Sequence, residues 1–315
     1  MHVPGKQKGM MNCHTLPRAS VCEKIVFAVP ILYNRRQTVA AGATANARRG
    51  ASFGPVPAVE MRWNMKRRFG ELKESGRSFI GTGIMIPAAE MVEIAGYAGF
   101  DFVIIDEEHT QFASETSIDL VRAAEASDII PIIRVPEVSE VYLKKALDTG
   151  ASAVVVPNIC DRRSAEEAVY YSRFAPAGGR GACPGVRANR FGMGDNGYYE
   201  NANRDVSVIA LIEGAKGMEN FDEIIGVKGI DAIYIGPVDL SMSMGLQGDV
   251  YNPRVVEAME RMIAKAQGKG HVVGTYCTQI DDAKKWIARG VNFIDYSTDT
   301  SMFMEICQGV VKAFL

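Results

Sequence analysis

Four polar side chains with complementary chemistry stand at or just beyond the ends of short apolar runs. They are His109, Arg134, Glu213 and Asp239. An imidazole can carry a proton near neutral pH, a guanidinium can bind a carboxylate or an oxyanion, and two carboxylates can hold a divalent cation. Parallel strands that each end in such a group would present one reaction centre at the carboxyl end of a barrel. The sequence therefore predicts an enzyme with a metal site, a base and an anion-binding arginine.

Glu213 and Asp239 are the expected metal ligands. They lie 26 residues apart at the ends of consecutive apolar runs, 206–213 and 232–241, so neighbouring barrel strands would bring them together. Ligand sets made of carboxylates favour Mg²⁺ or Mn²⁺, with water or substrate oxygens in the remaining positions. The alternative for each acid taken singly is a helix N-cap, because Glu213 precedes an expected helix and Asp239 precedes a possible turn.

His109 and Arg134 are the expected base and anion-binding group. His109 closes a run of three acids, Asp106, Glu107 and Glu108, which a buried site tolerates only beside a cation. A hydrogen-bonded structural histidine is the plainer alternative to a general base. The alternative for Arg134 is an ion pair with the same acids.

Two further positions are candidates for the site, and a second histidine is not. Asp148 ends an expected helix, where its charge faces the negative end of the helix dipole, and a partner such as His109 would offset that cost. The turn at Gly236 leaves backbone amides near Val238 open to a bound carboxylate. His271 begins an expected strand, which places it at the opposite end of the barrel, so we expect it to be structural.

From about residue 66 onward, strand-like runs alternate with amphipathic helical segments. The runs are continuously apolar, as in parallel strands that are covered on both faces. A Rossmann-type sheet also alternates strand and helix, but no GxGxxG follows the first strand, so eight repeats favour the α/β class and a closed (β/α)8 TIM barrel. The expected strands are 79–86, 102–106, 131–135, 153–159, 206–213, 232–241, 271–277 and 293–299. The expected helices are 88–98, 115–126, 139–148, one opened by Ser164, 215–225, 253–268, 281–289 and 300–314.

Two local signals add detail to this plan. Ser164 followed by Glu167 predicts a capping box at the start of the fourth helix. The unusually long loop 175–205 predicts a lid over the reaction centre, because long insertions in compact domains are usually functional. It carries Arg187 and Arg190, which suggest an acidic or bulky acceptor substrate.

The chain of 315 residues, 47% apolar and 23% charged, is long enough for one such barrel, which usually takes ~250 residues. We expect an N-terminal extension over residues 1–65 and the barrel over 66–315. The alternative for residues 1–60 is a targeting segment, because the stretch is rich in arginine and poor in acids.

Composition also limits which classes of partner, and which cellular compartment, are expected. A formal charge of −2 gives no reason to expect nucleic acid or an anionic membrane. The apolar stretch 25–33 is too short to span a bilayer. Six cysteines without a CxxC pair indicate reduced thiols and a cytoplasmic protein, with Cys160 and Cys277 expected to be buried.

The region from about residue 70 to the C-terminus resembles the HpcH/HpaI family of class II, metal-dependent pyruvate aldolases, within the phosphoenolpyruvate/pyruvate barrel superfamily. Six segments carry the resemblance in order, and the GPxDLS core of the last is the most specific. They are DFVIIDEEH, PIIRVP, LKKALDTGASAVVVPNI, APAGGRG, LIEGAKGMENFDEI and GIDAIYIGPVDLS.

The resemblance implies a role for each candidate residue. Glu213 and Asp239 would hold Mg²⁺ or Mn²⁺, with Co²⁺ also admitted. Arg134 would steady the keto oxygen as it becomes an enolate, and His109, paired with Asp148, would transfer protons.

The remaining roles concern water and the substrate carboxylate. By the same resemblance, Asp106 and Glu108 would order metal-bound waters, and Gly236 and Val238 would offer backbone contacts to the pyruvate carboxylate. The expected partners are 2-oxo acid and aldehyde substrates, together with other copies of the chain. The family commonly forms hexamers, as trimers of dimers, and exchanges the C-terminal helix between subunits.

The implied activity is cleavage or formation of 4-hydroxy-2-oxo acids, as pyruvate plus an aldehyde, through a metal-bound pyruvate enolate. One alternative is a decarboxylase on the same site, acting on oxaloacetate or resembling macrophomate synthase. A citrate lyase β-subunit type of enzyme fits the DEEH and GPVDLS segments less well. A catalytically inactive barrel that binds small acids is the non-enzymatic alternative.

Overall fold

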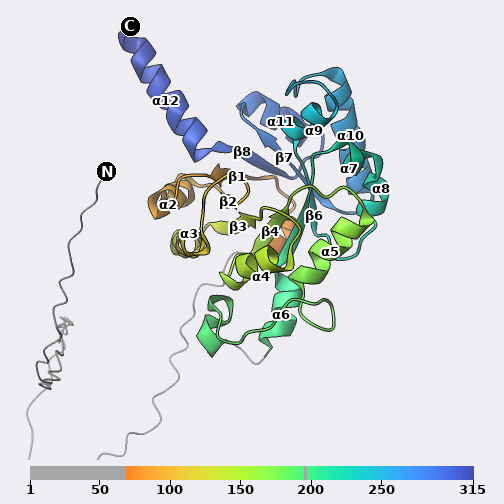
Figure 1. The fold of residues 1–315 in the computed structure, drawn as a ribbon. Helices are drawn as coiled ribbons and strands as arrows, with labels where there is room; N and C mark the ends of the chain where they lie inside the picture. The colour runs from red at the N-terminus through yellow and green to blue at the C-terminus, as the bar shows by residue number, and fades with distance from the viewer. Residues whose placement is uncertain (1–68, 195–196) are drawn as a thin grey trace, which may run out of the picture. The chain divides into compact units, whose positions relative to one another are not determined.

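The computed structural model describes residues 69–194 and 197–315. Within them, eight parallel strands pair in chain order and β8 pairs with β1, so the sheet closes into a barrel (Figure 1). The expected (β/α)8 architecture is confirmed. The strands are β1 (Phe79–Ile84), β2 (Phe102–Asp106), β3 (Ile130–Arg134), β4 (Ala153–Val156), β5 (Ser207–Ile212), β6 (Ala232–Ile235), β7 (Val272–Cys277) and β8 (Phe293–Thr298).

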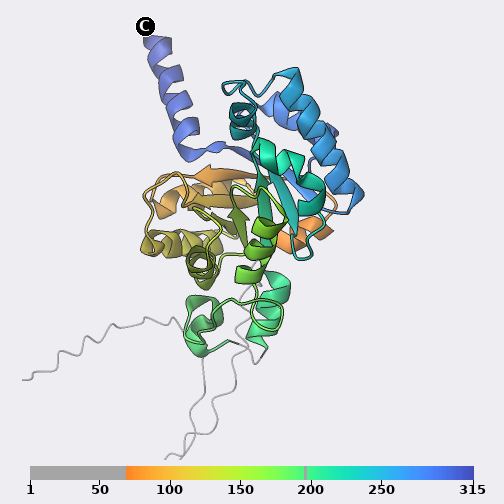
Figure 2. The same ribbon diagram turned by 45° about the vertical axis from the view of Figure 1, so that its right-hand side comes forward.

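Helices surround the barrel (Figures 1 and 2), and each expected helix is present. The expected helix 215–225 is two short helices that meet at Asn220. The segments α1, η1, α6 and α9 were not predicted. The helices are α1 (Phe69–Glu74), α2 (Ala89–Ala98), α3 (Ser114–Ala126), α4 (Glu140–Asp148), α5 (Arg162–Ser172), the 3₁₀ segment η1 (Arg187–Gly192), α6 (Tyr198–Asp205), α7 (Ala215–Glu219), α8 (Phe221–Ile224), α9 (Pro237–Ser243), α10 (Pro253–Gly268), α11 (Ile280–Ala288) and α12 (Asp299–Phe314).

Alternate side chains of each strand point into the barrel and form layers. Near the amino ends of the strands the filling is aromatic, and the rings of Phe79 and Phe293 stack with centroids 5.8 Å apart. The same alternation makes Asp106 and Arg134 the last inward positions of β2 and β3 and gives Glu213, just after β5, an inward direction. The barrel therefore changes from apolar to charged along its axis.

Helix α1 lies against the amino ends of the strands. The ring of Phe69 lies edge-on to Phe79 and Phe293, with centroids 5.5 and 5.6 Å away, and Phe69 is 1% exposed. The described part of the barrel therefore begins within the expected range 66–315. The expected extension, residues 1–65, lies outside the described residues.

The segment between α5 and β5 was expected to cover the carboxyl end of the barrel, and this prediction is wrong. Arg187 donates to Glu125 Oε1 at 3.0 Å and to the Thr149 carbonyl at 2.6 Å, at the ends of α3 and α4. A connection from a helix into the next strand returns to the amino end of that strand, so the segment lies at the opposite end of the barrel. It is also not structureless, because it contains η1 and α6.

The capping box of α5 is formed by different residues from those expected. The Asp161 side chain accepts from the Ser164 amide at 2.9 Å, and the Ser164 hydroxyl accepts from the Asp161 amide at 3.2 Å. Glu167 instead forms an ion pair with Arg163. Asp161 is a strong N-cap, so the helix begins earlier than the Ser164 signal suggested.

Helix α12 projects away from the barrel in both views (Figures 1 and 2). Within it only Asp299 is buried. Apolar side chains along its length are between 54% and 87% exposed: Phe303, Met304, Ile306, Val310, Val311 and Phe314. The expected terminal helix is confirmed, and its exchange between subunits stays a prediction.

Candidate active site at the carboxyl end of the barrel

Arg134 and Asp106 form a two-point ion pair at the carboxyl ends of β2 and β3. They are register partners, and Arg134 donates from Nε to Oδ1 at 3.0 Å and from Nη2 to Oδ2 at 2.7 Å. The Asp106 side chain is 3% exposed and that of Arg134 is 21% exposed. Burial lowers the pKa of Arg134, but the hydrogen bonds and charge of Asp106 outweigh it, so the pKa is raised. The guanidinium is therefore a fixed positive charge.

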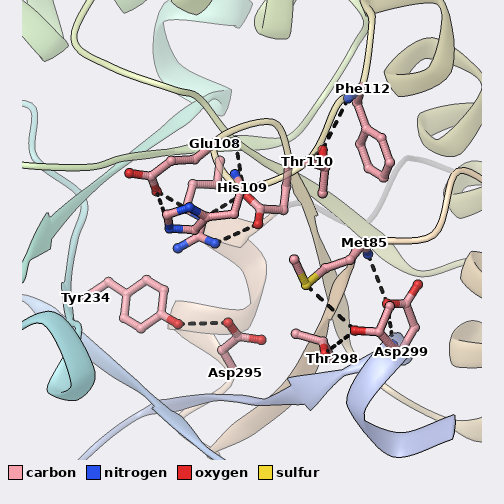
Figure 3. Close-up of polar contacts among 12 residues, drawn as sticks. Met85, Glu108, His109, Thr110, Phe112, Tyr234, Asp295, Thr298 and Asp299 are labelled. Atoms are coloured by element: carbon pink, nitrogen blue, oxygen red, sulfur yellow. Dashed lines mark hydrogen bonds and ion pairs between the residues drawn. The ribbon is translucent and has the colours of Figure 1, made fainter. Parts of the chain in front are cut away.

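Glu108 and His109 lie in a turn after β2 that the Asp106 side chain stabilises. Asp106 Oδ1 accepts from the amides of Glu108 and His109 at 3.0 and 3.3 Å. Glu108 Oε2 lies 3.4 Å from Arg134 Nε and 3.8 Å from His109 Nε2. Figure 3 shows the Glu108 and His109 side chains beside each other. The His109 side chain is 60% exposed, so it can meet a ligand that enters from solvent.

Glu213 follows β5 and points toward the same centre. The amide of Asn158 donates to Glu213 Oε1 at 2.9 Å. Burial raises the pKa of Glu213 to about 7, the Asn158 hydrogen bond opposes the rise, and the charges of Glu108 and Asp239 add to it. Asn158 has a positive φ of 56°, which asparagine tolerates better than most residues. Asn158 was not predicted as a site residue, and its position after Pro157 was the available signal.

Asp239 lies near the start of a helix rather than on a strand. It is the third residue of α9, whose first residue is Pro237. Gly236 makes room for the neighbouring acid, because a Cβ there would lie 3.0 Å from Glu213 Cβ and 3.3 Å from its Oε2. The Gly236 amide donates to the Ile212 carbonyl at 3.0 Å. It is therefore not free to bind a ligand, contrary to the prediction. The amide of Val238 lies in the first helical turn, where amides have no partner within the helix.

Three carboxylates lie near enough at this place to influence one another's charge. The charges of Glu108 and Asp239 raise the pKa of Glu213, and that of Asp239 also raises the pKa of Glu108, whose rise is caused chiefly by burial. Glu108 Oε2 is buried without a hydrogen bond. In the described residues no three His, Cys, Asp or Glu side chains are close enough to form a metal site alone. A cation held by two carboxylates would need water or substrate oxygens, which is the arrangement that Mg²⁺ favours.

Asp148 does not meet His109 within one barrel. Its Oδ1 accepts from Arg180 Nη2 at 2.6 Å, and the Arg180 side chain is 1% exposed. Helix α4 runs antiparallel to the strands, so its last residue lies at the amino end of the barrel, while His109 lies at the carboxyl end. Arg187 is also at the amino end, where it pairs with Glu125. The expectation that Arg187 binds substrate has no support from its position in this barrel.

Polar residues below and beside the site were also missed by the sequence analysis. Tyr234 on β6 donates from its hydroxyl to Asp295 Oδ2 on β8 at 2.7 Å (Figure 3). Asp299 accepts from the amides of Met85 and Ile86, both at 3.0 Å, and so ties the end of β1 to α12. No local pattern distinguishes these residues from ordinary strand residues, because their partners are far away in the chain.

His271 and Cys277 lie as expected, whereas Cys160 does not. His271 Nε2 contacts the Ile225 carbonyl at 2.8 Å, away from the site, as expected for a structural histidine. Cys277 is buried, which raises its pKa to about 12. Cys160 is only half-buried and lies 3.6 Å from Lys216 Nζ, so the expected burial is wrong for this thiol. In residues 69–194 and 197–315, we find no helix with the length and apolar character needed to span a membrane.

Comparisons with known proteins identify the family. The HpcH/HpaI aldolase/citrate lyase family matches residues 84–305. A 5-keto-4-deoxy-D-glucarate aldolase of Shigella dysenteriae serotype 1 (strain Sd197) is 31% identical over 222 residues, which cover 70% of this chain and 86% of that protein.

Solved structures show the same relationship. An HpcH/HpaI aldolase/citrate lyase family protein from Burkholderia cenocepacia J2315 is 30% identical, with a TM-score of 0.74 over 78% of this chain and 97% of that chain. Macrophomate synthase is 26% identical, with a TM-score of 0.69 over 78% of this chain and 88% of that chain. The chain therefore belongs to the HpcH/HpaI aldolase/citrate lyase family and is a carbon–carbon lyase.

Proposed function

We propose that this protein is a metal-dependent aldolase that cleaves or forms 4-hydroxy-2-oxo acids, with pyruvate and an aldehyde as the two halves. The observation that carries the proposal is the convergence of Glu108, Glu213 and Asp239 beside Arg134. Such a site can hold a cation and an anionic substrate together. The aldolase names of the relatives support the reaction class.

Glu213 and Asp239 are the proposed ligands of Mg²⁺ or Mn²⁺, with Co²⁺ as a substitute. Asp106 and Glu108, which both contact Arg134, would accept hydrogen bonds from ordered water. When bound, the divalent ion supplies Lewis-acid polarisation of the substrate keto oxygen. The mutual repulsion of the carboxylates supports this assignment, because a cation would relieve it.

Arg134 is the proposed stabiliser of the enolate. Asp106 occupies Nε and Nη2 of Arg134 and so fixes the plane of the guanidinium. The remaining nitrogen, Nη1, can donate to the keto oxygen as negative charge develops there. The Val238 amide, at the start of α9, would receive the substrate carboxylate, and Gly236 contributes by its lack of a side chain.

His109 is the proposed proton carrier. In the cleavage direction its imidazole takes the proton of the C4 hydroxyl, the C3–C4 bond breaks to give the aldehyde, and the bonding electrons form the pyruvate enolate. Protonation of the enolate at C3 completes the reaction. Glu108 Oε2 lies 3.8 Å from His109 Nε2, so Glu108 can orient the imidazole toward the substrate.

We also propose that the chain assembles with copies of itself, as a hexamer built as a trimer of dimers. The exposed apolar side chains of α12 support an exchange of this helix. Ile94 and Tyr97 on α2 are 59% and 74% exposed and offer a surface for such a helix. If Asp148 is the partner of His109, a second copy must supply it, because the two residues lie at opposite ends of one barrel.

The function is tested by incubating the protein with Mg²⁺ or Mn²⁺, pyruvate and a panel of aldehydes, and by detecting condensation products by mass. We expect products that disappear when EDTA removes the metal. Arg134→Lys should abolish most product formation, whereas Arg122→Lys, in an exposed ion pair with Asp119 on α3, serves as the matched control and should not. Product formation that survives EDTA would reject the metal assignment.

A decarboxylase is the second candidate function, and the similarity to macrophomate synthase is the observation that favours it. The same enolate could form by loss of carbon dioxide from oxaloacetate. Consumption of oxaloacetate without any aldehyde, at a rate above that of condensation, would support this candidate. Binding of Mg²⁺ with no turnover of either substrate would instead indicate an inactive small-acid-binding barrel.

A further inference from the structure

A buried polar pair lies inside the barrel, among side chains that are otherwise mostly apolar. Tyr234 and Asp295 are 4% and 6% exposed, and the Tyr234 hydroxyl donates to Asp295 Oδ2 at 2.7 Å. The other oxygen, Oδ1, is buried without a hydrogen bond among the described residues. Burial of an acid with an unsatisfied oxygen is costly, and neither residue has a part in the proposed aldol mechanism.

The pair lies one layer below the site. Tyr234 lies on β6, two residues before Gly236, which follows the strand. Asp295 lies on β8, two residues before Ser297. Figure 3 shows the pair beneath the Glu108 and His109 side chains. Gly236, the next inward position after Tyr234, has no side chain to fill the space between Tyr234 and the site above.

The groups that face Asp295 include one cation. Arg134 on β3 and Asp106 on β2 act on it from above, and Tyr276, its register partner on β7, lies beside it. Its register partner on β1 is Gly81, where a Cβ would lie 2.3 Å from the Phe102 ring. The inward residues of β4 and β5 at this level are apolar: Val155 and Leu211.

We propose that Tyr234 and Asp295 are positioning residues that act on the reaction through Arg134. When Asp295 is protonated, the guanidinium can direct its full charge toward an anion above it. When Asp295 is ionised, its charge opposes that anion from below. This inference rests on the proposed enolate chemistry.

The ionisation of Asp295 falls in a range where this effect is measurable. Burial raises the pKa of Asp295 to about 6, and the hydrogen bond from Tyr234 and the charge of Arg134 oppose the rise. Loss of the Tyr234 hydroxyl would therefore raise the pKa of Asp295 further, because the hydroxyl stabilises the carboxylate. The two variants Asp295→Asn and Tyr234→Phe thus have different expected effects on a pH profile.

The test measures the affinity for oxalate, a planar dianion with the shape of the pyruvate enolate. Calorimetry at saturating Mg²⁺ would follow the wild type, Asp295→Asn and Tyr234→Phe from about pH 5 to pH 8. In the wild type we expect affinity to fall by about tenfold more than in Asp295→Asn as the pH rises through the titration of Asp295. In Tyr234→Phe the midpoint should move to higher pH. The other titratable groups are the same in the wild type and Asp295→Asn, so the difference between these two curves isolates Asp295.

Equal pH dependence in the wild type and Asp295→Asn would overturn the inference. A uniform loss of affinity at every pH would do the same, because it would show a merely structural role. Thermal unfolding of each variant checks that it is folded. If oxalate binds neither protein in a Mg²⁺-dependent way, the proposed function itself fails, and this outcome is distinct from the first two.

Discussion

The two ends of the barrel differ in how their acidic side chains are paired with arginines. At the amino end, two acids each pair with an arginine: Asp148 accepts from Arg180 at 2.6 Å, and Glu125 pairs with Arg187. At the carboxyl end, several carboxylates gather around a single guanidinium, that of Arg134.

This difference indicates that charged residues at the amino end serve stability and those at the carboxyl end serve function. A buried charge with a matched partner is a satisfied structural group, and removing one partner is costly. Burial raises the pKa of Glu213 to about 7, and the charges of Glu108 and Asp239 add to the rise, so ionised carboxylates at the carboxyl end are unfavourable unless a cation binds. If this is correct, substitutions at the carboxyl end should change activity, whereas those at the amino end should change stability.

The largest expected effect is the loss of a proposed metal ligand. Glu213→Gln or Asp239→Asn should lower turnover roughly 10²–10³-fold, because the metal stabilises transition-state charge by several kcal/mol. The thermal stability of the metal-free protein should not fall, because each change removes a repelling charge. Steady-state kinetics and calorimetric unfolding measure the two effects. A variant with normal turnover would contradict the assignment.

Arg134→Lys should lower kcat about 10²-fold with a smaller change in KM, because lysine cannot hold Asp106 through two parallel hydrogen bonds. Kinetics with a good aldehyde acceptor would measure both constants. An increase in KM alone would show that Arg134 only binds substrate.

The metal-free protein should lose stability as the pH rises from about 5 to 8. Glu213 has a pKa of about 7 when folded, above its usual value, so the folded state binds the proton more tightly than the unfolded state. The contribution of Glu213 to the free energy of unfolding is present at low pH. It is lost as the pH rises through about 7, and the loss is at most about 3 kcal/mol. Thermal melts with and without Mg²⁺ test this, and Glu213→Gln should flatten the metal-free profile.

The smallest effect on activity is expected at the amino end. Arg187→Ala should cost about 1–3 kcal/mol of stability, because it removes the hydrogen bonds from Arg187 to Glu125 and to the Thr149 carbonyl. The affinity for Mg²⁺ should stay the same, as calorimetric titration can show. A changed metal affinity would show that the two ends are coupled, so that charge at the amino end also serves the reaction.

The strand-end residues were predictable because two simple rules place them. Strands of this barrel end in polar groups at the carboxyl side, and alternation directs Asp106, Arg134 and Glu213 inward. The lid was mispredicted because helices run antiparallel to strands, which places the segments after helices at the other end of the barrel. For the same reason Asp148 does not reach His109 within one barrel, and a contact between two copies stays a prediction. Tyr234 and Asp295 were missed because their contact depends on closure of the barrel across 61 residues.

Binding of Mn²⁺, followed by electron paramagnetic resonance, tests the central claim most directly. The wild type should bind Mn²⁺ at a site that Mg²⁺ displaces, and the double variant Glu213→Gln, Asp239→Asn should lose that site while remaining folded. Undiminished Mn²⁺ binding by the folded double variant would contradict the claim that the surplus carboxylates at the carboxyl end hold the catalytic cation.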